Sequence, residues 1–314
     1  MSQTSVLVLE DDPPPDLSRL TDRVRVITAG ESGLAELLPQ ADVLLVWDFL
    51  SDAVRDAWPA SGPTPSWVHT ASAGVDRLMF PGLVDSDTQL TNARGVFDQP
   101  IAEYVAGLVL AMAKDFRGTY ERQRQHRWQH RETLRVAGTR AVVVGSGPIG
   151  RAIGRTLSGL GVVVDLVGRT EREGVRAIAA LPELLPKADW VVSAAPLTDD
   201  TREMFGKAAF EAMPDRARFI NVGRGALVVQ RELAAALESG ELAGAALDVF
   251  EAEPLPAGDP LWDVQGLFIS PHMSGDVVGW RDALSEQFCD NFDRWAAGEP
   301  LFNVVDKRAG YVRG

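Results

Sequence analysis

Short runs of β-branched and other apolar residues alternate with helix-length stretches along most of the chain. This alternation is typical of parallel α/β domains, in which a helix follows each buried strand and returns across the sheet. In the first third of the chain, the runs predict strands at residues 6–9, 24–27, 43–46, 67–69 and 89–91. These strands predict one small α/β domain.

A second series of the same kind begins at Ala141. Its predicted strands cover residues 141–144, 162–167, 190–194, 219–222, 245–249 and 267–269. A last helix is predicted over about residues 277–297, and a tail, 301–311, follows it. We therefore predict two α/β domains with a cleft between them, and hinges near residues 93–99 and 274–280.

The two series are joined by a helical segment and a polar one. Pro100 is well placed for the first turn of an alanine-rich helix predicted from residue 101 to about 116. The arginine-rich stretch 120–135 is predicted to be a solvated arm or surface loop. His126 and His130 would share one face of a helix, but no carboxylate or cysteine set accompanies them, so no metal site is predicted.

Composition narrows the class of protein. A length of 314 residues suits two domains, and the net charge of −13 argues against nonspecific nucleic-acid binding. No apolar run reaches the length of a membrane span, and residues 1–12 lack the features of a signal peptide. The lone Cys289 cannot form an intrachain disulfide. We expect a cytoplasmic protein with no membrane or nucleic-acid partner.

A glycine-rich turn marks the start of the second series. Gly145-Ser146-Gly147-Pro148-Ile149-Gly150 follows a predicted buried strand and precedes a helical pattern. That context is required of a dinucleotide fingerprint, in which the helix N-terminus offers N–H groups to phosphates. Gly145 permits the tight turn, Gly147 lets the backbone approach a pyrophosphate, and Gly150 allows close packing of helix on strand.

The end of the next predicted strand bears on the choice of cofactor. An acidic residue there would bind the ribose 2′-hydroxyl of NAD, but the chain reads Gly168-Arg169-Thr170-Glu171-Arg172. Asp165 lies three residues too early. Arg169, with Thr170 and Arg172 nearby, is placed to bind a 2′-phosphate. We therefore favour NADP over NAD as the cofactor, with solvent-exposed arginines as the alternative interpretation.

Three polar segments follow later strands of the same domain: Asn221-Val222-Gly223-Arg224-Gly225, residues 248–255, and Ile269-Ser270-Pro271-His272-Met273-Ser274-Gly275. Ligands of open α/β sheets bind beyond the carboxyl ends of the strands. Hydride delivery to a keto carbon builds negative charge on oxygen, so it needs a proton donor such as histidine and a cation such as arginine. A carboxylate would orient the histidine, and spacing alone does not decide between Glu251 and Glu253.

These residues resemble the D-isomer-specific 2-hydroxyacid dehydrogenases over nearly the whole chain. The resemblance includes Ser72-Ala73-Gly74-Val75-Asp76, Asn92 and Glu103, the glycine turn and Pro196-Leu197-Thr198. It also includes the order Arg224, Glu253, His272, at separations of 29 and 19 positions. The fold implied is a Rossmann dinucleotide-binding domain, 94–280, inserted into a flavodoxin-like substrate domain, 1–93 and 281–314; both are doubly wound.

The resemblance also implies roles for individual residues. Arg224 would bind and polarise the substrate, His272 would be the acid/base and Glu253 its partner. Asp248 would bind the nicotinamide carboxamide. Further cofactor contacts would come from Ala195, Pro196, Val222 and Gly275, and substrate contacts from Ser72, Ala73 and Gly74. Gly168 replaces the Asp frequent in NAD-using members, which resembles the glyoxylate/hydroxypyruvate reductase branch.

The resemblance thus predicts an oxidoreductase that uses NAD(P)H to reduce a small 2-keto acid to a D-2-hydroxy acid, as a homodimer. The alternative is a dinucleotide-sensing binding protein or corepressor on the same fold. Formate dehydrogenase is disfavoured because that branch has an amide where this chain has Glu253. Trp47, Phe49 and Leu50 have two open interpretations, packing or shaping the substrate pocket. For Trp280 and Arg281 the open interpretations are lining the cleft or marking the hinge. His69 is interpreted as structural.

Overall fold

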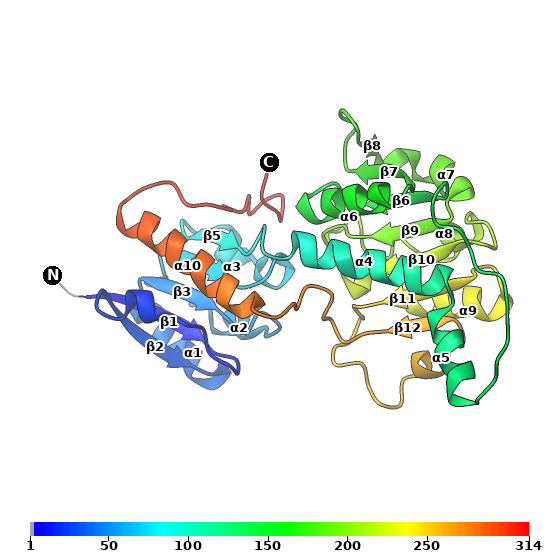
Figure 1. The fold of residues 1–314 in the computed structure, drawn as a ribbon. Coiled ribbons are helices and arrows are strands. Elements are labelled where there is room, and N and C mark those ends of the chain that lie inside the picture. The colour runs from blue at the N-terminus through cyan, green and yellow to red at the C-terminus, as the bar shows by residue number, and fades with distance from the viewer. Residues whose placement is uncertain (1–2, 314) are drawn as a thin grey trace. The chain divides into compact units, whose positions relative to one another are not determined.

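A computed structural model describes residues 3–313, which divide into two compact units. One unit comprises the residues up to Val96 together with those from Val277 onward, and the other is Phe97–Asp276. Each unit contains one parallel sheet with helices packed on it (Figure 1). The predicted α/β class is therefore confirmed. Within residues 3–313, no helix combines the length and the apolar character needed to cross a bilayer.

The first unit has a five-stranded parallel sheet in the order β2-β1-β3-β4-β5. The strands are β1 (Thr4–Leu9), β2 (Val24–Ala29), β3 (Val43–Val46), β4 (Trp67–Thr70) and β5 (Gln89–Asn92). Its helices are α1 (Glu31–Leu37), α2 (Ala53–Ala57), α3 (Pro81–Val84) and α10 (Trp280–Ala296). This strand order is the flavodoxin-like one that was predicted.

The second unit has a seven-stranded parallel sheet in the order β8-β7-β6-β9-β10-β11-β12. The strands are β6 (Arg140–Val144), β7 (Val163–Gly168), β8 (Arg176–Ala177), β9 (Trp190–Ser193), β10 (Arg218–Asn221), β11 (Gly244–Leu247) and β12 (Leu267–Ile269). The helices are α4 (Asp98–Ala113), α5 (Phe116–Arg124), α6 (Pro148–Gly159), α7 (Leu181–Leu184), α8 (Lys207–Glu211) and α9 (Gln230–Ser239). The order reverses between β6 and β9, which makes that point the switch point where dinucleotides bind in such folds. The two-residue β8 was not predicted.

The long helix predicted from residue 101 to about 116 is interrupted. It ends at Ala113, and Asp115 adopts a left-handed conformation with φ of 48° before α5 begins. The Asp115 carboxylate accepts the N–H of Gly118 at 3.0 Å, so it caps the new helix. Gly118 has no side chain to obstruct this cap, since a Cβ there would lie 2.3 Å from Asp115 Oδ1.

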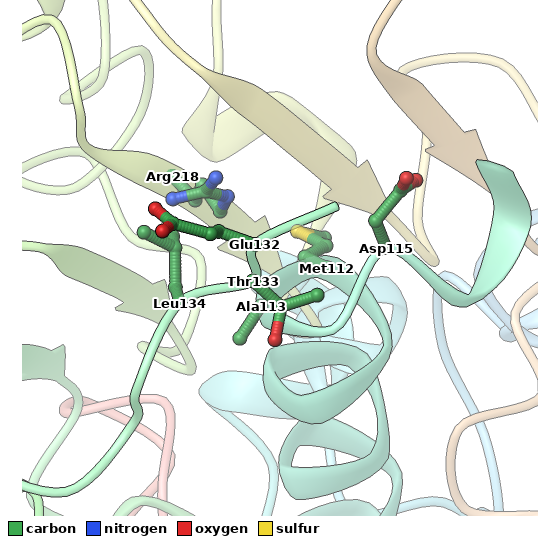
Figure 2. A pocket seen from close by; sticks show the side chains of 7 residues that line it. All are labelled: Met112, Ala113, Asp115, Glu132, Thr133, Leu134 and Arg218. Carbon is green, nitrogen blue, oxygen red and sulfur yellow. The ribbon is translucent and has the colours of Figure 1, made fainter. Parts of the chain in front are cut away.

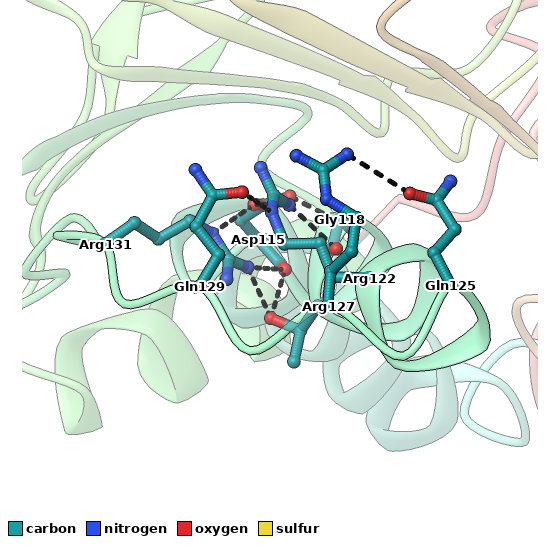
Figure 3. Close-up of polar contacts among 8 residues, drawn as sticks. Asp115, Gly118, Arg122, Gln125, Arg127, Gln129 and Arg131 are labelled. Carbon is teal, nitrogen blue, oxygen red and sulfur yellow. Dashed lines mark hydrogen bonds and ion pairs between the residues drawn. The ribbon is translucent and has the colours of Figure 1, made fainter.

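The stretch 120–135, predicted as a solvated arm or loop, is partly helical. Residues 120–124 belong to α5, and the remainder is an irregular segment. Arg131 donates from Nε to Asp115 Oδ2 at 2.7 Å and from Nη2 to the Asp115 carbonyl at 2.8 Å (Figure 3). Arg131 thus attaches the segment to the start of α5, while most of its residues are exposed, as predicted for a surface segment.

The last part of the chain completes the first unit. On α10, Phe288 stacks on Trp67 of β4 with ring centroids 5.2 Å apart. Beyond α10, Val305 is buried in the core of the first unit. The Lys307 ammonium donates to the carbonyls of Leu83 and Thr88, each at 3.0 Å. These contacts place the C-terminal segment against the sheet of the first unit.

His69, on β4, is fully buried in this unit beside Trp67 and Phe288. Its Nδ1 lies 2.8 Å from the Thr91 hydroxyl oxygen, whereas Nε2 has no hydrogen-bond partner among the described residues. Burial lowers the pKa of His69 from its ordinary value of 6.5 to about 3. The folded chain therefore holds this ring neutral at pH values where an unfolded chain would protonate it.

Replacing His69 with phenylalanine is expected to make the protein less sensitive to acid. Between pH 6.5 and about 3 the unfolded wild type binds a proton that the folded form does not, so its stability falls as the pH falls. Because one pK unit corresponds to about 1.4 kcal/mol, His69 should lower the free energy of unfolding by about 2 kcal/mol at pH 5 relative to pH 7.5. Urea unfolding at both pH values measures this difference, and exposed His130→Phe is the control. Equal acid sensitivity of His69→Phe and wild type would contradict the expectation.

Candidate active site

Two glycines of the turn after β6 stand where the backbone is packed too closely for a side chain. Gly145 has φ of 123°, and a Cβ there would lie 2.3 Å from the carbonyl oxygen of Ala194 beyond β9. A Cβ on Gly150 would lie 1.7 Å from the Gly145 carbonyl oxygen. Neither position accepts a side chain, because the strand ends and α6 approach each other too closely.

The same turn is open where a phosphate would bind. Gly147 is the N-cap residue of α6, and no atom lies within 4 Å of where its Cβ would stand. Pro148 occupies the first turn of α6, and both Pro148 and Ile149 are half-buried. A helix N-terminus with an open glycine at its cap suits the pyrophosphate of a dinucleotide. The chain's own residues therefore fit this cofactor.

The end of β7 carries the residues predicted to select the cofactor. Gly168 is buried, whereas Arg169, Thr170 and Arg172 are exposed. Arg172 donates from Nη2 to the Ser146 hydroxyl at 2.8 Å, so it reaches back over the glycine turn. Asp165 lies within β7 and forms an ion pair with Arg140 of β6 at 2.6 Å. That pairing is consistent with its exclusion as a ribose ligand.

Arg224 is positioned by a turn that a buried amide holds. Asn221, the last residue of β10, is fully buried. Its Oδ1 accepts the N–H of Gly223 at 3.1 Å, and its Nδ2 donates to the carbonyl of Arg224 at 2.9 Å. Arg224 also donates from Nη1 to the Gly223 carbonyl at 2.9 Å. The side-chain amide of Asn221 thus fixes the backbone from which the guanidinium projects.

His272 and Glu253 form a hydrogen-bonded pair. Nδ1 of His272 lies 2.7 Å from Oε2 of Glu253, and Oε1 of Glu253 accepts the N–H of Phe250 at 2.8 Å. Burial raises the pKa of Glu253, but the hydrogen bond and charge of His272, the Phe250 N–H and the charge of Arg224 outweigh it. The pKa of Glu253 therefore lies below its ordinary value, and the group remains a carboxylate. Glu251 is exposed, so Glu253 is the partner of the histidine.

Backbone contacts bring the Arg224 turn against the segment that carries Glu253. A Cβ on Gly225 would lie 1.9 Å from the carbonyl carbon of Phe250. A Cβ on Gly223 would lie 3.0 Å from the carbonyl oxygen of Ala195. The loops after β9, β10 and β11 are therefore in direct contact, and the Glu253–His272 pair extends the series to β12. The predicted catalytic residues gather at one edge of the sheet, together with the glycine turn after β6.

Asp248 holds the turn that carries His272. Its Oδ1 accepts the Ser270 hydroxyl at 2.7 Å and the Met273 N–H at 3.0 Å, and its Oδ2 accepts the Ser274 N–H at 2.9 Å. His272 itself has a left-handed φ of 51°, which is uncommon for a residue other than glycine. Three donors around His272 bind one buried carboxylate, so Asp248 supports this conformation. Its predicted contact with the nicotinamide carboxamide stays a proposal.

Two residues of this network had no predicted role. Tyr104, on α4, lies close enough to Ser270 and Asp248 for both to influence the pKa of its phenol. Burial raises the pKa of Tyr104, and the charge of Asp248 adds to the effect. Ser270 lies two residues before His272, and this proximity is the only feature of the local sequence that indicates a role for Ser270. Tyr104 carried no signal, because its contact joins segments far apart in the chain.

The other predicted cofactor residues line the same edge of the sheet. Ala195 and Val222, which follow β9 and β10, are buried, and the Val222 N–H donates to the Ser193 carbonyl at 3.0 Å. Pro196 is exposed, and its carbonyl accepts the Thr201 hydroxyl at 2.7 Å. Gly275 packs against the start of α4, since a Cβ there would lie 2.7 Å from the ring of Phe97, the N-cap residue of that helix. Their cofactor contacts stay predictions.

The predicted substrate residues of the first unit form a tight loop after β4. The Ser72 hydroxyl donates to the Gly74 carbonyl at 2.6 Å, and Asn92 Nδ2 donates to the Ala73 carbonyl at 2.6 Å. Within residues 3–313, the N–H groups of Ala73 and Gly74 donate to no other group. The loop thus has a fixed backbone and two N–H groups suited to an anion.

The aromatic residues whose role was left open are packed within the first unit. Trp47 is buried and donates from Nε1 to the Pro13 carbonyl at 2.9 Å. Phe49 meets the Trp280 ring edge-on with centroids 6.4 Å apart, and the Arg281 guanidinium lies 4.5 Å from the centre of that ring. The burial of Trp47 and its hydrogen bond to Pro13 favour a packing role for this residue over contact with a substrate.

A hollow of about 280 Å³ in the second unit is separate from this site. Figure 2 shows it between the end of α4, the segment 132–134 and Arg218. Arg218 is the first residue of β10, whereas Arg224 follows the end of that strand. The hollow therefore lies at the amino-terminal edge of the sheet, away from His272. No cluster of three or more metal-ligand side chains occurs within residues 3–313.

A glycine turn at a switch point, with a guanidinium and an imidazole–carboxylate pair on the same sheet edge, defines a dinucleotide-dependent oxidoreductase. A family model described as "D-isomer specific 2-hydroxyacid dehydrogenase, NAD binding domain" matches residues 106–274. The human protein named glyoxylate reductase/hydroxypyruvate reductase is 31% identical over 80% of each chain. The chain belongs to the D-isomer specific 2-hydroxyacid dehydrogenase family.

Other relatives cover nearly the full length. A glyoxylate reductase of Korarchaeum cryptofilum is 27% identical over 97% of this chain and 90% of its own. The structure of an NADPH-dependent glyoxylate/hydroxypyruvate reductase from Sinorhizobium meliloti, in complex with NADP and sulfate, is 29% identical. It superposes with a TM-score of 0.85 and covers 98% of this chain and 100% of that one. The predicted family and the Rossmann fold of its NAD-binding domain are confirmed.

Proposed function

We propose that the protein reduces a small 2-keto acid of the glyoxylate or hydroxypyruvate type to the D-2-hydroxy acid, with NADPH as the preferred cofactor. The observation that carries the proposal is the Glu253–His272 pair beside Arg224, in a domain of this family. A protein that only senses a dinucleotide has no need of a positioned proton donor. The names of the relatives support the same substrate class.

A bound nicotinamide would supply a hydride to the keto carbon, where a C–H bond would form as the carbonyl π bond breaks. His272 then gives its proton to the carbonyl oxygen, so that the product is an alcohol. Glu253 binds Nδ1 of the ring, which leaves Nε2 to carry that proton. Arg224 binds the substrate carboxylate and stabilises the negative charge that develops on the oxygen. In the first unit, the N–H groups of Ala73 and Gly74 are the proposed donors to an anionic substrate.

The preference for NADPH is proposed from the end of β7. Gly168 offers no carboxylate to a ribose hydroxyl, and Arg169, Thr170 and Arg172 can bind a 2′-phosphate. Arg172 already lies over the glycine turn through its bond to Ser146. The Sinorhizobium meliloti structure was solved with NADP, and one from Xanthobacter autotrophicus, 31% identical with a TM-score of 0.82, with NADPH. NAD remains the alternative cofactor.

Initial rates with a panel of keto acids test the proposal. Glyoxylate, hydroxypyruvate, pyruvate and a branched keto acid would each be assayed with NADPH and with NADH. We expect the highest kcat/KM for glyoxylate or hydroxypyruvate with NADPH. Oxidation of NADPH by none of the four keto acids would contradict the reductase proposal, and a higher kcat/KM with NADH would contradict only the cofactor preference.

We also propose a cytoplasmic homodimer. The polar stretch from α5 onward carries Phe116, Tyr120 and Trp128, whose exposed fractions are 58%, 59% and 102%. Large aromatic side chains this exposed are typical of protein interfaces. The single cysteine, Cys289, is buried, which suits a reducing compartment. Light scattering on the purified protein reports its oligomeric state.

A further inference from the structure

The side chain of Ser146 occupies the space in which a side chain at position 168 would begin. Ser146 is the second residue of the glycine turn, and Gly168 ends β7. A Cβ on Gly168 would lie 2.3 Å from Ser146 Oγ and 3.0 Å from Ser146 Cβ. It would also lie 3.0 Å from Cγ1 of Val175, which is buried. A side chain at position 168 therefore requires the Ser146 hydroxyl to move from its present position.

The same serine holds Arg172. Nη2 of Arg172 donates to Ser146 Oγ at 2.8 Å and contacts the Ser146 carbonyl oxygen at 3.3 Å. The backbone of Arg172 is fixed as well, because it exchanges two hydrogen bonds with Val175, at 3.0 and 2.9 Å. Arg172 is therefore held both at its backbone and at its guanidinium. Within residues 3–313, Nη2 is the only guanidinium nitrogen that contacts Ser146.

We propose that Ser146 is a specificity-determining residue for the cofactor, acting through both neighbours. Its hydroxyl excludes an aspartate at position 168, the residue type that would bind the 2′-hydroxyl of NAD. It also holds Arg172 where a 2′-phosphate can be bound by the remaining guanidinium donors. The inference rests on the proposed NADPH preference and adds a coupling between the glycine turn and the end of β7.

The coupling predicts that exchanging residue 168 alone cannot change the preferred cofactor. In Gly168→Asp, the new side chain meets Ser146, so affinity falls for nucleotides with and without the 2′-phosphate. In Ser146→Gly/Gly168→Asp, the obstruction by Ser146 and the anchor for Arg172 are both removed, while the contact with Val175 remains. The double variant should then bind the nucleotide without the 2′-phosphate more tightly than Gly168→Asp does.

Calorimetric titration with 2′,5′-ADP and with 5′-ADP separates these effects without catalysis. We expect the wild type to bind 2′,5′-ADP more tightly, and Ser146→Ala to reduce that preference by about fivefold, as for the loss of one typical hydrogen bond. Arg172→Ala should reduce it further. Arg176→Ala is the matched control, because it removes a positive charge from the next strand and should leave the preference within twofold of wild type. Thermal melts check that each variant is folded.

The outcomes distinguish this inference from the proposal on which it rests. If the wild type binds 5′-ADP as tightly as 2′,5′-ADP, the NADPH preference fails and the role of Ser146 fails with it. If the wild type prefers 2′,5′-ADP but Ser146→Ala keeps the full preference, only the role of Ser146 is overturned. A folded Gly168→Asp variant that gains affinity for 5′-ADP without a change at position 146 would also overturn it.

Discussion

Replacing His272 with glutamine is expected to lower kcat for keto-acid reduction by about 10²- to 10⁴-fold, the usual contribution of a positioned general acid. Glutamine retains a polar side chain of similar reach but cannot release a proton. The glycine turn after β6, which is proposed to bind the pyrophosphate, is separated by three strands of the sheet from the loop after β12 that carries His272. The Kd for NADPH, measured by nucleotide fluorescence, should therefore stay close to that of the wild type.

His130→Gln is the matched control for this variant, since the same exchange is made at an exposed histidine. It should keep the wild-type kcat. A His272→Gln protein with normal turnover would remove His272 from the mechanism. If kcat fell only because NADPH no longer bound, His272 would be a cofactor residue instead of the acid.

Arg224→Ala is expected to lower kcat/KM for the keto acid by about 10³-fold, as for other groups that stabilise a developing oxyanion. The loss should appear in KM as well as in kcat, because the same guanidinium is proposed to bind the carboxylate of the substrate. Arg224→Lys should recover only part of it, since an ammonium cannot bind a carboxylate through two parallel hydrogen bonds. Steady-state kinetics at saturating NADPH measure both constants.

Arg231→Ala provides the comparison for Arg224. Arg231 lies on α9 in the same domain, and its side chain is 85% exposed. That variant should match the wild type in kcat and KM. An Arg224→Ala protein that keeps its kcat/KM would show that the substrate carboxylate is bound elsewhere, and the proposed geometry would have to be abandoned.

Most strands could be predicted closely because they are runs of mainly apolar residues, some of them fully buried, such as β3 and β9. Residues 43–46 and 267–269 match β3 and β12 without correction. The interruption at Asp115 could not be predicted, because it depends on a left-handed residue whose carboxylate binds Gly118 and Arg131. Nothing in the alanine-rich pattern before it indicates that the helix stops.

The proposed catalytic residues could be selected from the sequence, but the contacts that hold them could not. Strand order brings the segments of Arg224, Glu253 and His272 together, and the family resemblance chose Glu253 over Glu251. The Asp248–Ser270 bond joins residues 22 positions apart, and the Arg172–Ser146 bond spans 26. Such contacts depend on side-chain directions across several strands, which local patterns of polarity do not contain.

A crystal structure with NADP and oxalate bound would test most directly whether these residues surround the reacting carbon. Oxalate carries the carboxylate and an adjacent oxygen of a 2-keto acid but accepts no hydride. We predict that Arg224 binds the oxalate, that Nε2 of His272 lies within hydrogen-bond distance of the oxygen that mimics the carbonyl, and that the nicotinamide ring lies against the carbon between them. Oxalate bound away from Arg224, or a His272 ring turned away from the nicotinamide, would contradict the proposed mechanism.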